Sequence, residues 1–399
     1  MDHRLQDGLV FEPRTRPPPA YRLLLLNVAS GAAPTDVAAT LDDVTTMLSE
    51  LAAGRVRELE GQPKEHADAT ARQFAGLRTL IGYGARFFET DVHKPHLTHA
   101  ARPQYLTYLA DDGPFPALRW ANGATKDAEA DVALQLTADT AAAVNCAAVE
   151  CWKLVEDERL PLSVVGTFSG FGRDDGRGWL EFHDGVSNIE SSQRLVALEA
   201  GADPPWMTRG TYMAYLRLVI DLGSWRALDR ADQELIVGRD KLSGAALIRS
   251  ERVGGRAVPV AATAPDANAT AEESAAWRDP PQTTDPLVEE SHIHRANQNR
   301  ASPNAAAGLR MFRQGFDYFE GFDEGVPRVG LNFVSFQADL RTFQHVLHLP
   351  AWLGDANFGG PSQPKDGEPD APPLVGVLAG GFYAVPPRGD SFPGSTLFG

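Results

Sequence analysis

The first part of the chain predicts a strand, a helix and a second strand from its pattern of apolar and polar positions. The leucine-rich run Tyr21 to Val28 ends at Ser30 and Gly31, and it predicts a buried strand. Apolar residues at helical spacing predict a helix from Thr35 to Leu51. The short apolar run Leu77 to Tyr83 predicts another strand.

A further helix and a further strand complete the predicted first half. Residues Asp131 to Leu154 are alanine-rich, which indicates a helix. The run Leu162 to Phe171 predicts a strand, because it is apolar and glycines lie at its end, at Gly170 and Gly172. Together these elements suggest a βαββαβ unit.

The second half predicts a similar order of elements, although no repeat is visible in its sequence. Its predicted elements are strands at Thr211 to Leu222, Gly330 to Phe336 and Gly376 to Val385, with helices at Asp229 to Val237 and Asp339 to Leu347. The sequence therefore predicts an α+β protein that is built from two βαββαβ halves.

Segments with few apolar positions set the expected domain bounds. Residues 1–20 hold charges and prolines and form an N-terminal extension, and the first half then spans residues 21–188. A polar, proline-bearing segment from Ile189 to Arg209 leads into the second half, residues 205–399. An insert rich in alanine, proline and acidic residues at about 256–285 is expected to be a surface loop.

Composition narrows the class of partner and the compartment. The formal net charge of −16 argues against nucleic acid, because phosphate contacts need a basic surface. No apolar run approaches the roughly 18 residues of a membrane span, so no membrane partner is expected. Residues Met1 to Tyr21 lack the apolar core of a signal peptide and any twin-arginine signal, so we expect a cytoplasmic protein. A homo-oligomer stays open.

The two cysteines, Cys146 and Cys151, lie five residues apart in the predicted helix Asp131 to Leu154. Two cysteines in a chain of 399 residues do not indicate a disulfide framework. We expect both to be small buried side chains rather than a disulfide or a metal-binding pair.

Three kinds of polar residue could carry chemistry, although each alone has a more ordinary explanation. His292 and His294 could be surface or capping residues, or a zinc pair that no CxxC or HExxH pattern completes. Asp184 precedes a glycine, which is a common turn pair, and a carboxylate held at a turn can also accept and return a proton. Arg313 alone would be a surface or salt-bridge arginine.

Five segments in a fixed order make the combination specific. The chain runs through FHDG (182–185), VGRDKLSG (237–244), SHIHRANQ (291–298), LRMFRQGFDYFEG (309–321) and GLNFVSFQADLRTF (330–343). This set resembles the dye-decolourising haem peroxidases, the DyP-type family, and is similar to its larger, insert-bearing members. The resemblance covers the chain from about Gly166 to the C-terminus, and it covers the first half by the predicted order of elements.

The resemblance implies two ferredoxin-like halves with antiparallel sheets packed together and haem held in the C-terminal half. His292 falls at the position of the family's haem-ligating histidine, so haem b, one per chain, is the implied cofactor, with one imidazole on iron. Asp184 matches the aspartate of the family's GxxDG segment, and Arg313 matches the arginine before the glycine–aromatic pair.

The resemblance implies four further residues at the cofactor. At one position, in the loop that carries Asp184, the sequence differs from the family pattern. Arg239 is a candidate for a haem propionate, while Asn188 matches the asparagine after the family's DG and would hold the same loop. Leu331 and Phe333 share one face of their predicted strand and would form an apolar wall. Glu181 replaces the first glycine of GxxDG, which would alter the turn.

The implied function is a peroxidase that reduces hydrogen peroxide while it oxidises dyes, phenols or other organic reductants. Asp184 would move a proton between the two oxygens of the peroxide, and Arg313 would stabilise negative charge as the O–O bond breaks. Two alternatives stay open: a haem-binding or haem-trafficking protein with incidental peroxidase activity, and a haem-free binding protein in which His292 is structural. The presence of both Asp184 and Arg313 favours the enzyme.

Overall fold

The computed structural model describes most of the chain. The described residues are 5–9, 17–90, 102–109, 128–184, 204–263, 282–296, 311–347, 374–389 and 391–398, with single positions 92, 121, 124, 186 and 188. The first half contains β1 (Ala20–Val28), α1 (Pro34–Ala52), α2 (Lys64–Gln73), β2 (Arg78–Gly84), β3 (Val132–Ala138), α3 (Ala141–Asp157) and β4 (Leu162–Phe171).

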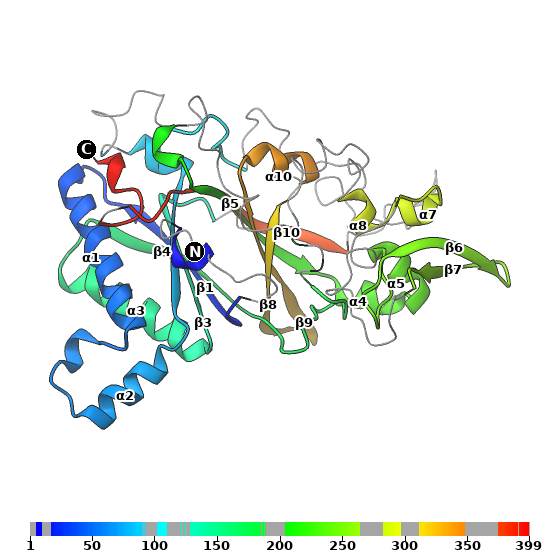
Figure 1. The fold of residues 1–399 in the computed structure, drawn as a ribbon, viewed down its shortest axis with the longest axis horizontal. Helices are drawn as coiled ribbons and strands as arrows, with labels where there is room; N and C mark the ends of the chain where they lie inside the picture. The colour runs from blue at the N-terminus through cyan, green and yellow to red at the C-terminus, as the bar shows by residue number, and fades with distance from the viewer. Residues whose placement is uncertain are drawn as a thin grey trace.

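The second half has the same order of main strands, with additional short helices and a hairpin between them. It contains β5 (Thr211–Ile220), α4 (Leu222–Ala227), α5 (Arg230–Val237), β6 (Leu247–Val253), β7 (Arg256–Ala261), α7 (Pro286–Glu289), α8 (His292–Arg295), β8 (Phe312–Asp323), β9 (Val326–Gln337), α10 (Leu340–Leu347) and β10 (Val375–Val385). Short 3-10 helices lie at Asp7–Leu9, Arg57–Leu59, Ala85–Glu89, Pro205–Met207 and Ser395–Leu397. The antiparallel β6–β7 hairpin extends away from the rest of the structure (Figure 1).

The main strands close into an antiparallel barrel in the order β1-β3-β2-β10-β5-β9-β8-β4. Each half contributes four neighbouring strands, β4-β1-β3-β2 from the first half and β10-β5-β9-β8 from the second. Counted within its own half, each sheet has the same strand order, fourth, first, third and second, as expected for a ferredoxin-like unit. The predicted α+β class with two ferredoxin-like halves is therefore confirmed.

The two sheets are joined at both of their edges, which the sequence did not predict. On one side β2 pairs with β10, where Tyr83 lies opposite Ala384. On the other side β4 pairs with β8 through Phe171 and Asp317. This second seam brings a segment of the first half directly against the second half, and the cavity described below lies beside it.

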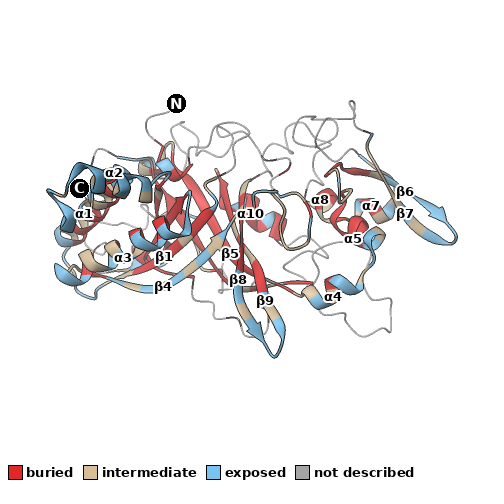
Figure 2. Cartoon of the chain, turned by 90° about the horizontal axis from the view of Figure 1, so that it is seen from below, coloured by how far each residue is buried: buried red, intermediate tan, exposed pale blue. Residues whose placement is uncertain are grey.

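Burial on both faces explains why the barrel strands are so apolar. In β1, Leu23 and Leu25 face the barrel interior with Tyr215 and Phe336, whereas the alternate leucines face the helices of the first half. Figure 2 shows the barrel strands as largely buried, with exposed residues on the outer helices and the β6–β7 hairpin. A sheet that is covered on both sides loses the apolar–polar alternation of a half-exposed strand.

Helix α1 and helix α3 cover the sheet of the first half. In α1, Pro34 occupies the first turn, and the buried residues follow helical spacing: Val37, Thr40, Leu41, Val44, Leu48 and Leu51. In α3, the side chain of Thr140 caps the helix by accepting a hydrogen bond of 3.2 Å from the Ala143 amide. Both helices therefore present one apolar stripe to the sheet.

Several predictions about local structure are wrong. The predicted helix Asp131 to Leu154 is the strand β3 followed by α3, because all seven residues of β3 are buried and show no alternation. The first residues of the expected insert at 256–285 form β7, and residues 264–281 lie outside the described residues. Cys151 is buried as predicted, and burial raises its pKa to about 12, but Cys146 is exposed.

No helix in the described part of the chain is both long enough and apolar enough to cross a bilayer.

Candidate active site

His292 is held by a short helical segment on the second half. Asp285 caps α7 by accepting a hydrogen bond of 3.0 Å from the Leu287 amide, and its other carboxylate oxygen accepts from the backbone and hydroxyl of Ser250 in β6. Helix α8 follows at once and begins with His292. The position of His292 therefore depends on contacts with the β6–β7 hairpin.

Close packing against helix α5 fixes the same segment from the other side. Gly238 ends α5 with a left-handed φ of +89°, and a Cβ at this position would collide with the hydroxyl of Ser291. Ser291 is fully buried and donates its hydroxyl to the carbonyl of Val288 at 2.7 Å. A glycine at 238 thus allows the start of α8 to approach α5.

His294 has a structural environment that differs from that of His292. His294 is buried, and its Nε2 lies 3.2 Å from the carbonyl oxygen of Leu247. His292 is half-buried and lines a cavity, whereas His294 does not line it. Because α8 is helical, the two rings point in different directions, which does not fit a zinc pair.

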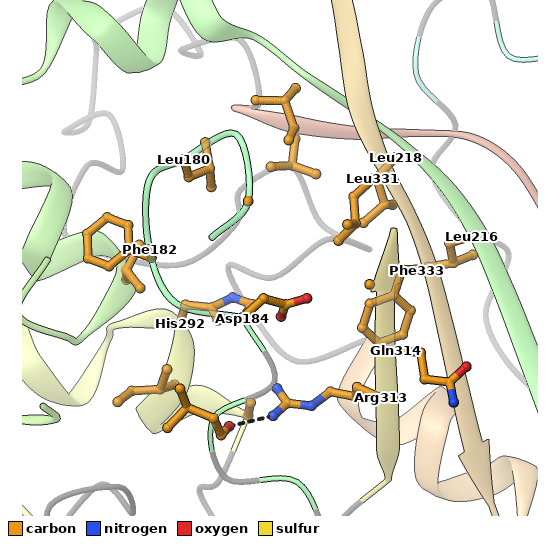
Figure 3. A pocket seen from close by; sticks show the side chains of 18 of the residues that line it. Leu180, Phe182, Asp184, Leu216, Leu218, His292, Arg313, Gln314, Leu331 and Phe333 are labelled. Carbon is orange, nitrogen blue, oxygen red and sulfur yellow. Dashed lines mark hydrogen bonds between the residues drawn. The ribbon is translucent and has the colours of Figure 1, made fainter. Parts of the chain in front are cut away.

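The cavity lies between α8, the loop after β4 and the outer face of the second sheet. It has a volume of about 240 Å³. Most of its wall is apolar: Leu180, Phe182, Val186, Leu216, Leu218, Ile220, Val237, Met311, Leu331, Phe333, Phe343, Val346, Leu347 and Val375. His292, Asp184 and Arg313 add polar groups to this wall (Figure 3). Arg239 and Asp317 also line it.

Asp184 and Arg313 enter the cavity from opposite sides. Asp184 comes from the loop after β4 in the first half, and Arg313 comes from β8 in the second half (Figure 3). The Asp184 carboxylate lies directly against Gly315, where a Cβ would collide with Oδ2 and come within 3.3 Å of Cγ. A glycine at 315 is therefore required for the carboxylate to stand beside Arg313.

The loop that carries Asp184 is fixed by hydrogen bonds of Arg177. Its Nη1 donates to the carbonyl oxygens of Glu181 at 2.6 Å and Lys241 at 2.7 Å. Its Nη2 lies 2.9 Å from Nε2 of His183, and an arginine can only donate, so this ring nitrogen accepts. The amide of Asp184 donates to the carbonyl of Gly176 at 2.9 Å, so the loop closes on itself.

Asn188 joins this loop to β8. Its side-chain amide donates to the carbonyl of Arg313, and its side-chain oxygen accepts from the Arg313 amide, both at 2.8 Å. The guanidinium of Arg313 also donates to the carbonyl of Val186 at 2.9 Å. Asn188 does not line the cavity, so its observed role is to hold the loop rather than to contact a cofactor.

Arg313 lies in a mostly apolar cavity, near the negative charge of Asp184. Burial lowers the pKa of the Arg313 guanidinium, and the negative charge of Asp184 partly opposes this effect. The guanidinium remains protonated at any physiological pH, because arginine starts from so high a value. A desolvated cation beside a carboxylate is suited to stabilise negative charge that develops in the cavity.

Three other predicted residues also face the cavity. Leu331 and Phe333 lie on one face of β9 and form part of the apolar wall (Figure 3). Arg239 is a buried part of the cavity wall and donates from Nη1 to the carbonyl of Gly244 at 2.9 Å. The structure thus brings every predicted site residue except Asn188 to one cavity.

Glu181 has a backbone conformation that favours glycine. Its φ is +65°, in the left-handed region that residues with a Cβ seldom adopt. Its amide donates to the carbonyl of Gly178 at 2.8 Å, and its carboxylate lies 3.5 Å from Arg173. The backbone thus holds the glutamate in a left-handed conformation, and the expectation that the substitution alters the family's turn stays a prediction.

Asp317 is a cavity residue that the sequence did not single out. It lies two residues beyond Gly315 on the same face of β8 and is buried. Burial, and after it the negative charge of Asp184, raise its pKa to about 7, and the positive charge of Arg173 opposes this rise. The sequence signal was the spacing in RQGFD, which puts Asp317 on the same face as Arg313 if the segment is a strand. This strand was not predicted from the sequence, so Asp317 was not identified there.

Comparisons with known proteins agree with this arrangement. Residues 175–368 match the family described as Dyp-type peroxidase, C-terminal. A dye-decolorizing peroxidase from Thermobifida fusca (strain YX) is 34% identical over 160 residues, which are 39% of this chain and 32% of the relative. A deferrochelatase from Shigella flexneri serotype 5b (strain 8401) is 29% identical over 226 residues, which are 53% of this chain and 48% of the relative.

Solved structures share the fold over nearly the whole chain. A DyP-type peroxidase from Cellulomonas bogoriensis has a TM-score of 0.67 at 23% identity, covering 98% of this chain and 99% of its own. Ferric DtpA from Streptomyces lividans has a TM-score of 0.68 at 23% identity, covering 99% and 97%. The chain spans about a third to about half of the length of the curated relatives it matches. Residues 175–368 therefore match the C-terminal part of the DyP-type peroxidase family, and the chain shares the fold of solved DyP-type structures.

Proposed function

We propose that this protein is a haem peroxidase that reduces hydrogen peroxide and oxidises an organic electron donor. The observation that carries the proposal is the meeting of His292, Asp184 and Arg313 in one apolar cavity. An imidazole, a carboxylate and a desolvated guanidinium are the groups that peroxide reduction at a haem requires.

The donor set of the cavity fits haem. A flat apolar ring system needs an extended apolar wall, which Leu216, Leu331 and Phe333 help to form. Its carboxylates need a cation at the rim, for which Arg239 is our candidate. The ring of His292, half-buried at the cavity edge, would bind the iron. We propose haem b, one molecule per chain.

When bound, haem supplies the iron at which peroxide is reduced, and a reductant returns the two electrons. Asp184 accepts a proton from hydrogen peroxide and gives it to the oxygen that leaves as water. Arg313 stays protonated and stabilises the negative charge that develops as the O–O bond breaks. Gly315 allows the Asp184 carboxylate to lie beside Arg313, and Asn188 holds the two segments in register.

A haem-trafficking role is the second candidate, because several relatives carry the name deferrochelatase. That role needs a haem site, but it does not by itself need a desolvated arginine beside a carboxylate. The burial of Arg313 next to Asp184 therefore supports the peroxidase over this alternative.

Haem binding and turnover test the proposal in sequence. The protein is purified, loaded with haem and examined for a Soret band, and then for oxidation of a dye by hydrogen peroxide. The expected result is a stable complex that turns over, and Asp184→Asn should retain haem but react slowly with peroxide. If Asp184→Asn reacts at the wild-type rate, the proton acceptor is another group, and His183 is the first to test. A protein that binds haem without turnover supports the haem-trafficking role.

A further inference from the structure

Two carboxylates, not one, project into the cavity on the outer face of the second sheet. Asp184 lies against Gly315, and Asp317 follows two residues later on the same face of β8. Residues i and i+2 of a strand are about 7 Å apart, so the two carboxyl groups share one small region of low polarity. The peroxidase proposal uses Asp184 and gives Asp317 no role.

The neighbours of Asp317 limit how a negative charge there can be compensated. Across the two flanking strands its partners are Leu331 in β9 and Phe171 in β4, and neither carries a charge. The loop after β4 contributes the backbone amide of Trp179, which hydrogen-bonds to the carboxylate. The same loop brings the charged groups that face Asp317 among the described residues: Asp184, Asp175 and Arg173.

Arg173 is the one cation of this group, and its hydrogen bonds go elsewhere. It donates to the two carboxylate oxygens of Asp175 at 2.6 and 3.1 Å, and it lies 3.5 Å from Glu181. Its charge is therefore shared among several acidic groups, and Asp317 receives only part of it. The cation that pairs with the cavity carboxylates from the other side is Arg313, which lies nearer Asp184.

We propose that Asp317 and Asp184 form a coupled carboxylate pair that holds a single proton, with Asp317 the protonated member and Asp184 the ionised one. Two carboxylates this close disfavour being charged together, and the more deeply buried one keeps the proton. Asp184 is open to the cavity and stands beside Arg313, whereas Asp317 is buried under the loop. The raised pKa of Asp317 supports this assignment.

In this arrangement Asp317 is a positioning residue. It need not touch peroxide, but its proton keeps the cavity from carrying two negative charges, so Asp184 remains the group that exchanges a proton with the substrate. As the pH rises and Asp317 ionises, the cavity gains a second negative charge near the Asp184 carboxylate, and the two like charges repel each other. The effect on the reaction with peroxide rests on the proposed function. The sharing of one proton between the two carboxylates does not depend on that function.

Isotope-edited infrared titration of aspartate carboxyl groups tests the pair in haem-free and haem-loaded protein. In wild type, one aspartate should titrate near pH 7, and Asp317→Asn, which is nearly isosteric, should remove that transition. Asp184→Asn should move the transition to lower pH by removing the like charge. Arg173→Gln should move it to higher pH, and Asp175→Asn should move it to lower pH.

The outcomes separate this inference from the peroxidase proposal. An Asp317 transition that Asp184→Asn leaves in place, or the absence of any aspartate that titrates above pH 5, would overturn the coupled pair. The coupled transition in a protein that fails to turn over would support the pair and reject the peroxidase. In an active enzyme, the rate of reaction with peroxide should show an inflection near pH 7 that Asp317→Asn lacks, and an unchanged inflection would count against Asp317.

Discussion

Asn188 and Arg313 form two hydrogen bonds of 2.8 Å, one in each direction, between residues 125 positions apart in the sequence. An amide side chain that pairs with a peptide in this way imitates a neighbouring strand and fixes position and direction together. The loop with Asp184 and the strand with Arg313 are therefore aligned by a residue that does not line the cavity.

Asn188→Ala should impair the reaction with peroxide without preventing haem binding. Losing both bonds leaves the Arg313 backbone groups without their side-chain partner, which costs about 1–3 kcal/mol of stability. A displacement of Arg313 relative to Asp184 should also slow the reaction with peroxide by roughly 10-fold or more. Thermal unfolding and stopped-flow absorbance measure the two effects. Asn145→Ala, at a polar contact with Arg22 on the outer surface, is the control, and equal rates for both variants would contradict the alignment role.

His292→Ala should abolish stable haem binding, because it removes the proposed iron ligand. His294→Ala should keep haem but lower the melting temperature, since the buried ring bonds to the carbonyl of Leu247. His345→Ala, at an exposed position of α10, should change neither property. The haem content after gel filtration and the Soret absorbance report the result, and equal haem in the first two variants would remove His292 from the site.

Arg313→Leu should keep haem and slow the reaction with hydrogen peroxide about 100-fold or more, because one donor to developing charge is lost. The leucine is compatible with the apolar wall, so folding should be preserved. Arg328→Leu, an exposed arginine on the neighbouring strand β9, is the matched control. A wild-type rate of peroxide consumption in Arg313→Leu would show that charge stabilisation comes from elsewhere.

The stability of the haem-free protein should decrease between about pH 4 and pH 7. Burial and the charge of Asp184 raise the pKa of Asp317 to about 7, whereas an unfolded aspartate titrates near 3.9. The folded state then binds more protons than the unfolded state in this window, so the free energy of unfolding falls as pH rises. The decrease is at most about 4 kcal/mol. Urea unfolding at several pH values should show a flatter dependence in Asp317→Asn, and an identical slope would argue against the raised pKa.

Glu181→Gly should stabilise the protein by up to about 1 kcal/mol. The substitution relieves the left-handed backbone at φ +65°, which costs a residue with a Cβ about 1–2 kcal/mol, and part of this gain is lost because glycine makes the unfolded chain more flexible. Glu181→Ala keeps the strain and removes the charge, so it separates the two contributions. A melting temperature that rises equally in both variants would mean that the charge, not the backbone, is responsible.

The sequence predicted which residues line the cavity better than it predicted the strands around them. His292, Asp184 and Arg313 were found because their segments carry a specific order of residue types. The strand β3 was missed because its residues are buried on both faces, so that it looked like the start of the alanine-rich helix. The strand β8 was missed because polar residues such as Gln314 and Asp317 are buried in it, which breaks the usual alternation.

The closure of the barrel could not be predicted from local patterns. The pairs Tyr83 with Ala384 and Phe171 with Asp317 join segments that are distant in the sequence, and neither segment contains a signal for its partner. For the same reason, the sequence did not show that Asp184 and Asp317 lie close together. Only the arrangement in space shows that both carboxylates belong to one cavity.

The pairing of β4 with β8 bears on the order in which the parts of the cavity come together as the protein folds. The proposed iron ligand His292 and the wall of β9 belong to the second half alone, whereas Asp184 reaches the cavity only when the loop after β4 has docked across the seam. Contacts between such distant segments form late, because a long loop must first be closed. A newly made chain should thus form the segment with the proposed iron ligand and the β9 wall before the Asp184 carboxylate joins them, so that a partly folded molecule would lack the carboxylate that exchanges the proton.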